Sequence, residues 1–281
     1  MYGYPLVDGS GGEKSVAKFQ DQAQTYWDKF YKANGDRFFK DRHWIVREFP
    51  ELLQTPDAGE GRSSKRQRAA HESTWHETDE PEALPLVLDI GCGVGNTLFP
   101  VDAATGFRYR WASIDLSETA ISIVRSNARF DASRHTAFVC DFVTQPIPAD
   151  LVPAGGCQVA TLFFVLSAIA PRLHSQALAI VFAALKEGGV LLFRDYHRQD
   201  HAETRFQDGG RSQIGEHFFV RQDGTQSYFF EESELQATAE AVGFQVARLA
   251  PVKRDLSNRK EALDIKAGRS FLQGVFMKPK G

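Results

Sequence analysis

A glycine-rich segment directly after a short apolar run constrains the fold of this 281-residue chain more than any other feature. The apolar run covers 86–90, and Gly91, Gly93 and Gly95 follow it at alternate positions. Glycines let the backbone turn tightly and let a ligand approach it closely. A helical pattern over 96–104 comes next. A strand, a glycine turn and a helix in this order are typical of the ligand-binding end of an open parallel sheet.

The remainder of the chain alternates short apolar runs with helical patterns, which is typical of a parallel sheet with crossover helices. Strands are expected at 86–90, 110–115, 136–140, 158–164, 189–194, 244–250 and 271–277. Helices are expected at 96–104, 118–129, 172–187 and 233–243. Two strand-like runs flank Asp223-Gly224 and predict a β-hairpin insertion over 215–230. The sequence thus predicts an α/β fold with a mostly parallel seven-stranded sheet and helices on both faces.

Four segments differ in composition. Residues 1–18 are glycine-rich and are expected to be disordered. Residues 19–53 are rich in aromatic side chains and form a predicted helical and aromatic extension that caps the ligand site, with a helix over 20–31. Residues 54–83 have few aliphatic side chains and are expected to be a flexible insertion. Residues 84–281 form the predicted catalytic domain.

Charge is distributed unevenly along the chain. The net charge is −3, yet the stretch 29–47 has six basic residues against two acidic ones, and 248–280 has nine against three. Basic segments of this kind favour a polyanionic partner, and solvated surface charge is the alternative. Lys65, Arg66 and Arg68 in the insertion predict either a mobile basic arm, a nuclear-localisation patch or a plain surface loop.

Cysteine usage and hydropathy restrict the compartment. Cys92, Cys140 and Cys157 lie far apart and lack metal-ligand spacing, which favours a reducing environment and argues against a disulfide framework or a zinc site. The histidines show no pairing that predicts a metal. No stretch reaches the roughly 20 apolar residues of a membrane span. The expected location is the cytosol, with the nucleus as an open alternative, and no membrane partner is expected.

The glycine turn suits one class of cofactor better than another. Dinucleotide sites use G-x-G-x-x-G, whereas this turn has G-x-G-x-G with Asp89 two residues before it. An acid at that place suits a cationic amino-acid moiety better than a pyrophosphate. Asp115, 20 residues after Gly95, is placed to accept hydrogen bonds from ribose hydroxyls. The segment D-I-G-C-G-V-G-N therefore resembles the first motif of S-adenosylmethionine-dependent class I methyltransferases, with a ligand-free tight turn as the alternative.

Longer segments resemble one family, the tRNA 3-methylcytidine methyltransferases. The resemblance covers about residues 20–279 and rests on YWDKFY at 26–31, FFKDRHW at 38–44, REF at 47–49, FVLSA at 164–168, FRDY at 193–196, DHA at 200–202 and FVRQDGTQSYFF at 219–230. It implies a Rossmann-like class I methyltransferase fold. The chain departs from the family pattern in its longer 54–83 insertion, in His197 where glycine is usual, and at 264–268.

The resemblance also implies a reaction. The family transfers the sulfonium methyl of S-adenosylmethionine to N3 of a cytidine in the tRNA anticodon loop, usually at position 32. N3 has a lone pair at neutral pH, so positioning and electrostatics are expected to supply the rate without an obligatory general base. Because N3 lies on the Watson–Crick edge, the base has to be turned out of its stack. A nearby carboxylate would stabilise the cationic product base.

Site residues follow from the motifs and the resemblance. Asp195, just past the fifth strand, is the candidate carboxylate, with a salt bridge or a structural turn as its alternative. The expected catalytic group is Asp195, Phe39, Arg42 and Tyr196. The expected cofactor contacts are Trp44, Asp89, Gly91, Gly93, Gly95, Asp115, Asp141 and Phe163. The expected substrate contacts are Phe38, Lys40, Asp41, His43, Arg47, Arg194, Arg221, Arg254, Arg259 and Arg269. Several of these residues have a purely structural alternative: Asp141 as a turn or N-cap residue, Phe163 as a core residue, and the charged side chains as members of surface ion pairs.

Two other functions compete with this one. A methyltransferase acting on a protein or a small molecule would keep the same cofactor, and a binding module would use the fold only to recruit tRNA. Some members of the family need a partner, either seryl-tRNA synthetase or another tRNA-binding protein. The chain alone is expected to be a monomer that binds tRNA.

Overall fold

The computed structural model describes residues 13–53, 84–209, 212–255 and 268–281. Lys65, Arg66, Arg68 and Arg259 therefore lie outside the described residues, as does the predicted insertion 54–83.

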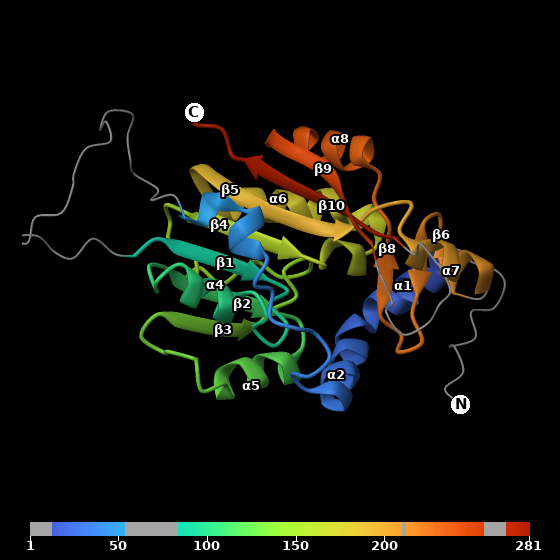
Figure 1. Ribbon diagram of the computed structural model, residues 1–281, viewed down its shortest axis with the longest axis horizontal. Helices are drawn as coiled ribbons and strands as arrows, with labels where there is room; N and C mark the ends of the chain where they lie inside the picture. Colours follow the sequence, from blue (N-terminus) through green and yellow to red (C-terminus); the bar gives the residue numbers. More distant parts are fainter. Residues whose placement is uncertain (1–12, 54–83, 210–211, 256–267) are drawn as a thin grey trace, which may run out of the picture.

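A seven-stranded sheet forms the centre of the molecule, in the order β3-β2-β1-β4-β5-β10-β9 (Figure 1). The strands are β1 Leu86–Ile90, β2 Arg110–Asp115, β3 His135–Val139, β4 Cys157–Phe163, β5 Leu185–Tyr196, β9 Gln245–Asp255 and β10 Gly268–Met277. The five strands from β3 to β5 are parallel, and β10 runs antiparallel to both of its neighbours. The predicted α/β class and the seven-stranded, mostly parallel sheet are confirmed.

Helices cover both faces of this sheet. They are α4 Leu98–Ala104, α5 Glu118–Ser126, α6 His174–Ala184 and α8 Glu232–Val242. Alternate residues of a strand point to opposite faces, and Val87 and Leu88 of β1 accordingly belong to two different core clusters. The cluster of Val87 includes side chains of α4 and α5, and the cluster of Leu88 includes side chains of α6 and α8. Each face therefore buries its own apolar layer.

Most boundaries fall within a few residues of the expected ones. Helix α5 ends at Ser126, earlier than the predicted 129, because Asn127 has an extended backbone. Helix α6 begins at His174, after the short 3-10 helix η3 Pro171–Leu173, since Pro171 is accommodated best at a helix start. A further 3-10 helix, η2 Leu166–Ala168, follows β4.

The hairpin predicted over 215–230 is present and is larger than expected. Strands β7 Phe218–Val220 and β8 Gln226–Tyr228 pair antiparallel around the turn at Gly224, whose φ is 86°. A third strand, β6 Gln213–Gly215, and helix α7 His201–Gly209 complete the insertion. A strand of three residues has too few positions for an alternating pattern, which is why the sequence did not indicate it.

The described part of the amino-terminal segment forms four helices: the first two lie at the carboxyl ends of the parallel strands, and the last two pack beside α4 and the residue before β2. It contains α1 Glu13–Asp21, α2 Ala23–Asn34, α3 Ile45–Glu48 and the 3-10 helix η1 Pro50–Leu53. Residues 13–18, for which the sequence predicted disorder, belong to α1, because Val16 and Phe19 pack against the main core. In Figure 1, α1 and α2 lie beside the strand arrowheads, close to the β6–β8 insertion.

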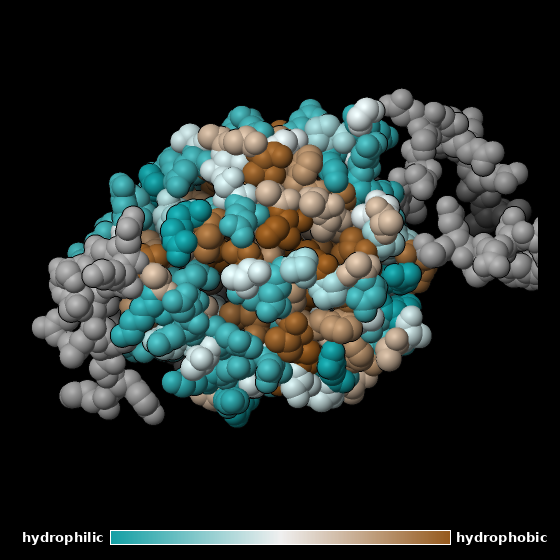
Figure 2. All heavy atoms as spheres, turned by 180° about the vertical axis from the view of Figure 1, so that it is seen from behind, coloured by the Kyte–Doolittle hydropathy of each residue, from teal (hydrophilic) through white to brown (hydrophobic). Residues whose placement is uncertain are grey.

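Figure 2 shows the distribution of hydropathy on the opposite face of the molecule. In the view from behind, hydrophobic side chains show in the middle of the folded part and hydrophilic ones cover its margins (Figure 2). Exposed apolar atoms of this kind are normal for a folded domain. Among the described helices, none is long and apolar enough to span a bilayer.

Candidate functional site

The glycine turn after β1 has a backbone conformation that favours glycine at three positions. Gly91, Gly93 and Gly95 have φ values of 63°, 56° and 88°, a region that other residues rarely adopt. A Cβ at Gly91 would lie 2.3 Å from Cγ2 of Val165, and a Cβ at Gly93 would lie 2.7 Å from the Tyr31 hydroxyl oxygen. The turn is thus shaped both by its backbone conformation and by the side chains that pack against it.

Asp115 at the end of β2 holds this turn. Its Oδ2 accepts a hydrogen bond from the Gly93 amide at 2.9 Å, and its Oδ1 accepts one from the Ser117 amide at 2.9 Å. Burial raises the pKa of Asp115 to about 6, against the lowering effect of the two amides. The carboxylate braces the turn from the neighbouring strand, at the place where an acid meets ribose hydroxyls.

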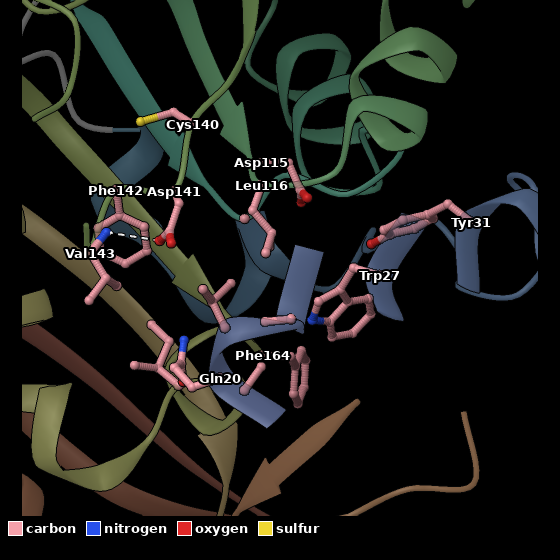
Figure 3. A pocket seen from close by; sticks show the side chains of 15 residues that line it. Gln20, Trp27, Tyr31, Asp115, Leu116, Cys140, Asp141, Phe142, Val143 and Phe164 are labelled. Atoms are coloured by element: carbon pink, nitrogen blue, oxygen red, sulfur yellow. Dashed lines mark hydrogen bonds between the residues drawn. The ribbon is translucent and has the colours of Figure 1, made fainter. Parts of the chain in front are cut away.

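The turn and Asp115 form one wall of a pocket that we call the glycine-turn pocket (Figure 3). Its other walls come from α1, α2 and the loops after β3 and β4. Its lining includes Gln20, Trp27, Tyr31, Gly91, Asp115, Leu116, Asp141, Phe142, Val143, Phe164 and Ile169. The pocket combines two carboxylates with apolar and aromatic walls.

Asp141 takes part in the pocket and in a turn at the same time. Its Oδ1 accepts a hydrogen bond from the Val143 amide at 3.2 Å, and its Oδ2 accepts one from the Thr144 hydroxyl at 2.8 Å. The turn role left open by the sequence is therefore present. Because Asp141 also lines the pocket, the same carboxylate is placed to face an amino group.

The glycine-turn pocket fits S-adenosylmethionine. Gly91 would allow a close backbone approach, and Asp115 would offer an acceptor to the ribose hydroxyls. Asp141 lies beside the apolar side chains of Phe142 and Val143, where a flat base with an exocyclic amine would be accommodated. Trp27 from α2 adds an aromatic wall.

Asp89 lies behind the turn and is not among the residues that line the pocket. It is buried, its Oδ1 accepts a hydrogen bond from the Thr161 hydroxyl at 2.6 Å, and its Oδ2 has no hydrogen-bond partner among the described residues. Burial raises the pKa of Asp89 to about 6, and the Arg42 guanidinium opposes this rise. Asp89 therefore acts on the site through its charge, and direct contact with the cofactor stays a prediction.

A second pocket adjoins the first one and shares five lining residues with it: Trp27, Tyr31, Gly91, Phe164 and Ala168. We call it the Tyr196 pocket. Its own lining includes Phe39, Arg42, Asn96, Phe163, Ser167, Tyr196, Arg221 and Gln226. A ligand in the glycine-turn pocket and a ligand in the Tyr196 pocket would thus meet at Gly91 and Phe164.

Hydrogen-bonding groups surround the Tyr196 pocket. Nη1 of Arg42 donates to the Thr97 hydroxyl at 3.1 Å and to the Phe163 carbonyl at 3.3 Å. Nη2 of Arg221 donates to the Tyr196 hydroxyl at 3.0 Å. Gln226 is buried, and its Oε1 has no partner among the described residues. Two guanidiniums, a phenol and an amide beside aromatic rings can recognise the edge and the face of a flat base.

Asp195, the predicted catalytic carboxylate, stands behind this pocket. It is fully buried and does not line either pocket. Its Oδ2 accepts a hydrogen bond from the Ser167 amide and its Oδ1 one from the Tyr196 amide, each at 2.9 Å. Burial raises the pKa of Asp195 to about 6. Asp195 thus positions two residues of the pocket wall, which is the structural alternative that its sequence context left open.

Phe164 occupies a special place between the two pockets. It follows β4 with a φ of 61°, an uncommon and costly conformation for a large side chain. Its amide donates to the Arg194 carbonyl at 2.8 Å, and the Arg42 guanidinium lies 5.2 Å from the centre of its ring. In this conformation the Phe164 ring lies at the junction of the two pockets.

Trp44, Arg194, Arg254 and Arg269 lie together outside both pockets. The Arg194 guanidinium stacks on Trp44 at 4.2 Å from the ring centre, and the Trp44 ring lies 5.7 Å from that of Phe163. Trp44, predicted to contact the cofactor, therefore does not line the glycine-turn pocket.

Three of the remaining predicted substrate contacts line a surface hollow, and Phe38 and Arg47 do not. Lys40, Asp41 and His43 line it, and Asp41 forms an ion pair with Arg129 at 2.9 Å. Phe38 beside them is 57% exposed and packs edge-on against Phe30 and Phe39. Arg47 is exposed and pairs with Glu48 at 3.2 Å.

Sequence reasoning missed several residues of the two pockets. Gln20, Trp27 and Tyr31 reach the site from α1 and α2, and Phe164 and Gln226 complete its walls. The YWDKFY motif contains Trp27 and Tyr31 and was the signal that could have placed them there. Within the described residues, no group of three or more His, Cys, Asp or Glu side chains is arranged to hold a metal ion.

Comparisons with known proteins agree with this geometry. A family model described as a methyltransferase domain matches residues 41–249. The tRNA N(3)-cytidine methyltransferase METTL6 of Rattus norvegicus is 38% identical over 93% of this chain and 82% of its own length. The tRNA N(3)-methylcytidine methyltransferase trm141 of Schizosaccharomyces pombe is 35% identical over 94% of this chain and 95% of its own length.

A solved structure supports the fold alone. The SAM-dependent methyltransferase from Anabaena variabilis has a TM-score of 0.58 and 15% sequence identity to this chain. The match covers 92% of this chain and 94% of that one, so the similarity of fold extends over nearly all of both proteins.

Proposed function

Since this chain belongs to the family of tRNA N(3)-cytidine methyltransferases, we propose that it forms 3-methylcytidine in tRNA, at position 32 of the anticodon loop. The cofactor is S-adenosylmethionine. The observation that carries the proposal is the shared wall of Gly91 and Phe164. It joins a pocket that fits this cofactor to a pocket lined for a flat, polar base.

The chain's residues position the donor and the acceptor. When bound, the cofactor supplies an electrophilic methyl group on a sulfonium. The glycine turn and Asp115 hold it on one side of Phe164, and the Tyr196 pocket holds the cytosine on the other side. The N3 lone pair is available at neutral pH, so the wall has only to bring N3 in line with the methyl group. No side chain of the described pockets has to remove a proton.

Hydrogen bonds and charge complete the proposed arrangement. Arg42 and Arg221 donate to the O2 carbonyl of the base, and the amide of Gln226 bonds to another part of its Watson–Crick edge. The product base is a cation. The guanidiniums of Arg42 and Arg221 would oppose that positive charge, and the buried carboxylates of Asp89 and Asp195 lie near enough to these arginines to offset it.

The RNA is proposed to reach the site across the basic side of the molecule. Phe38 and the hollow of Lys40 and His43 would contact the loop, and Arg254 and Arg269 its backbone. The net charge of −3 favours help from a partner, either seryl-tRNA synthetase or another tRNA-binding protein. The chain itself is proposed to be a monomer that works in the cytosol, with the nucleus as the second compartment.

A direct assay tests the activity and its position. Purified protein and labelled S-adenosylmethionine are incubated with tRNA transcripts, with and without the partner candidates. We expect label in 3-methylcytidine at position 32, and none in a transcript with uridine at that position. Label in another nucleoside would contradict the assigned base, and label at another cytidine would contradict the assigned position.

The same labelled cofactor, incubated with a cell extract in place of the transcripts, separates the alternative acceptors. A protein or small-molecule methyltransferase with this cofactor pocket would leave label in a ribonuclease-resistant fraction of a cell extract. A non-catalytic module would bind tRNA without transferring label to it.

A further inference from the structure

A third pocket shares Phe164 with the two pockets of the proposed active site. We call it the arginine pocket. Its lining residues are Trp44, Phe164, Arg194, Arg254, Arg269 and Phe271. It lies where the last residues of β5 meet β9 and β10, next to the carboxyl end of β4. It combines three guanidiniums with three aromatic rings.

Arg194 is the unusual member of this group. It is 1% exposed, and its Nε has no hydrogen-bond acceptor among the described residues. Its Nη1 donates to Glu48 and, at 3.1 Å, to Oε1 of Gln273. Burial lowers the pKa of Arg194 to about 10, which leaves it charged at neutral pH. A buried guanidinium with an unused donor is a favourable partner for an anion.

Stacking keeps the three arginines in place. The Arg194 guanidinium lies between the rings of Trp44 at 4.2 Å and Phe271 at 4.9 Å. Arg254 lies 5.9 Å from the Trp44 ring, and Arg269 lies 5.1 Å from the Phe271 ring. Because these contacts already restrict the rotamers of the three side chains, binding a ligand costs less conformational entropy. The pocket is therefore organised before a ligand arrives.

The charges of the pocket do not cancel. Glu48 pairs with Arg194 and with Arg254, the latter at 2.8 Å, and Asp200 pairs with Arg269 at 2.9 Å. Three guanidiniums of the pocket thus face two carboxylates, and one of these, Glu48, also pairs with Arg47. Positive charge therefore exceeds negative charge at this pocket, which favours an anionic ligand such as a phosphodiester.

The position of the arginine pocket indicates which phosphodiester of the RNA it would bind. Phe164 separates it from the Tyr196 pocket, and Arg269 lies 5.7 Å from the Tyr196 ring. A nucleotide whose base is in the Tyr196 pocket would have its backbone close to this neighbouring wall. We propose that the arginine pocket binds one backbone phosphodiester beside the target nucleotide and so sets which base enters; this inference rests on the proposed function.

Two exposed arginines of β9 allow a matched test. The side chains of Arg254 and Arg248 are each 43% exposed and each pair with a glutamate, but only Arg254 lines the pocket. The probe is an anticodon stem–loop RNA with a cytidine at position 32. For Arg254→Gln we expect the slope of log K against log salt to fall by about 0.7, as one lost phosphate contact in a single strand predicts. Arg248→Gln should keep the wild-type slope.

A phosphate-specific readout identifies the contact. One phosphodiester at a time is replaced by a neutral methylphosphonate, and affinities are measured with both proteins. At one position beside the target cytidine, the replacement should weaken wild-type binding and have little further effect on Arg254→Gln. Glu48→Gln removes the carboxylate that competes with the phosphate, and it should tighten binding. A folding defect would not move the two variants in opposite directions.

The outcomes separate this inference from the proposed function. Additive effects at every loop position, or an unchanged salt slope in Arg254→Gln, would overturn the phosphate site even if the wild-type protein methylates the cytidine. Transfer to another base, with the coupling intact, would overturn the proposed function and leave the phosphate site standing. Absence of RNA binding, both with and without the partner candidates, would overturn both.

Discussion

Asp115→Asn is the most informative single substitution for the cofactor site. The carboxylate of Asp115 accepts hydrogen bonds from the Gly93 and Ser117 amides and lines the glycine-turn pocket. Asparagine has the same shape but only one acceptor oxygen. One amide hydrogen would lose its acceptor, and the ribose would lose a charged one.

The expected size follows from the lost hydrogen bond. A hydrogen bond to a charged group contributes about 1.5–3 kcal/mol. Because about 1.4 kcal/mol corresponds to a factor of ten in affinity, the dissociation constant of S-adenosylmethionine should rise about 10- to 150-fold. The free energy of unfolding should change less, since the substitution also removes a buried carboxylate whose pKa is raised to about 6.

Calorimetric titration of the cofactor, with thermal unfolding of the same samples, measures both quantities. Asp131→Asn is the matched control, because Asp131 accepts the amide of Ser133 in the same two-residue geometry and does not line the pocket. A rise of less than about threefold in Asp115→Asn, in a folded protein, would refute the role given to this carboxylate.

Three further predictions use other features of the site. Gly91→Ala should unfold at a lower denaturant concentration than Gly106→Ala. Both glycines have a positive φ, but only a Cβ at Gly91 would lie against Val165. Equal losses of stability in the two variants would show that backbone strain alone matters. Cofactor affinity should rise about tenfold between pH 5 and 7, because the pKa of Asp115, raised to about 6, keeps much of this carboxyl group neutral at the lower pH. The free energy of unfolding, measured in urea, should change in the opposite direction. The neutral carboxyl group of Asp115 stabilises the fold below about pH 4, and this contribution is lost as the pH rises through 6. Asp115→Asn should flatten part of that rise in affinity. Tyr196→Phe should lower turnover on tRNA with little change in cofactor affinity, since it removes the acceptor of the Arg221 hydrogen bond, and a parallel loss of both would place Tyr196 in the cofactor site instead.

The sheet was predictable because its signals are local. The apolar run 86–90 and the glycines after it need no distant partner to be recognised, and the structure places them as β1 and its turn. The hairpin around Asp223-Gly224 was predictable for the same reason. Helix α1 was not, because its first residues are ordered by the packing of Val16 against a core that the local sequence does not show.

The functional residues also differ in whether local sequence or distant packing fixes their place. Asp115 was predictable because one strand and one turn fix its place. Asp195 was expected to face the substrate, but its two amide partners come from η2 and from its own strand end, and their arrangement depends on the fold. The side chains of Trp27 and Tyr31 reach the pocket only because α2 packs beside α5, and Trp44 packs on Arg194, not on the cofactor pocket.

Mass spectrometry of ribonuclease fragments of individual purified tRNAs, from cells that lack this gene, tests the central claim most directly. The account predicts that 3-methylcytidine at position 32 falls in at least one tRNA, returns with the wild-type gene, and does not return with a Gly91→Ala variant. Unchanged 3-methylcytidine in every tRNA, or recovery with a variant that does not bind the cofactor, would contradict it.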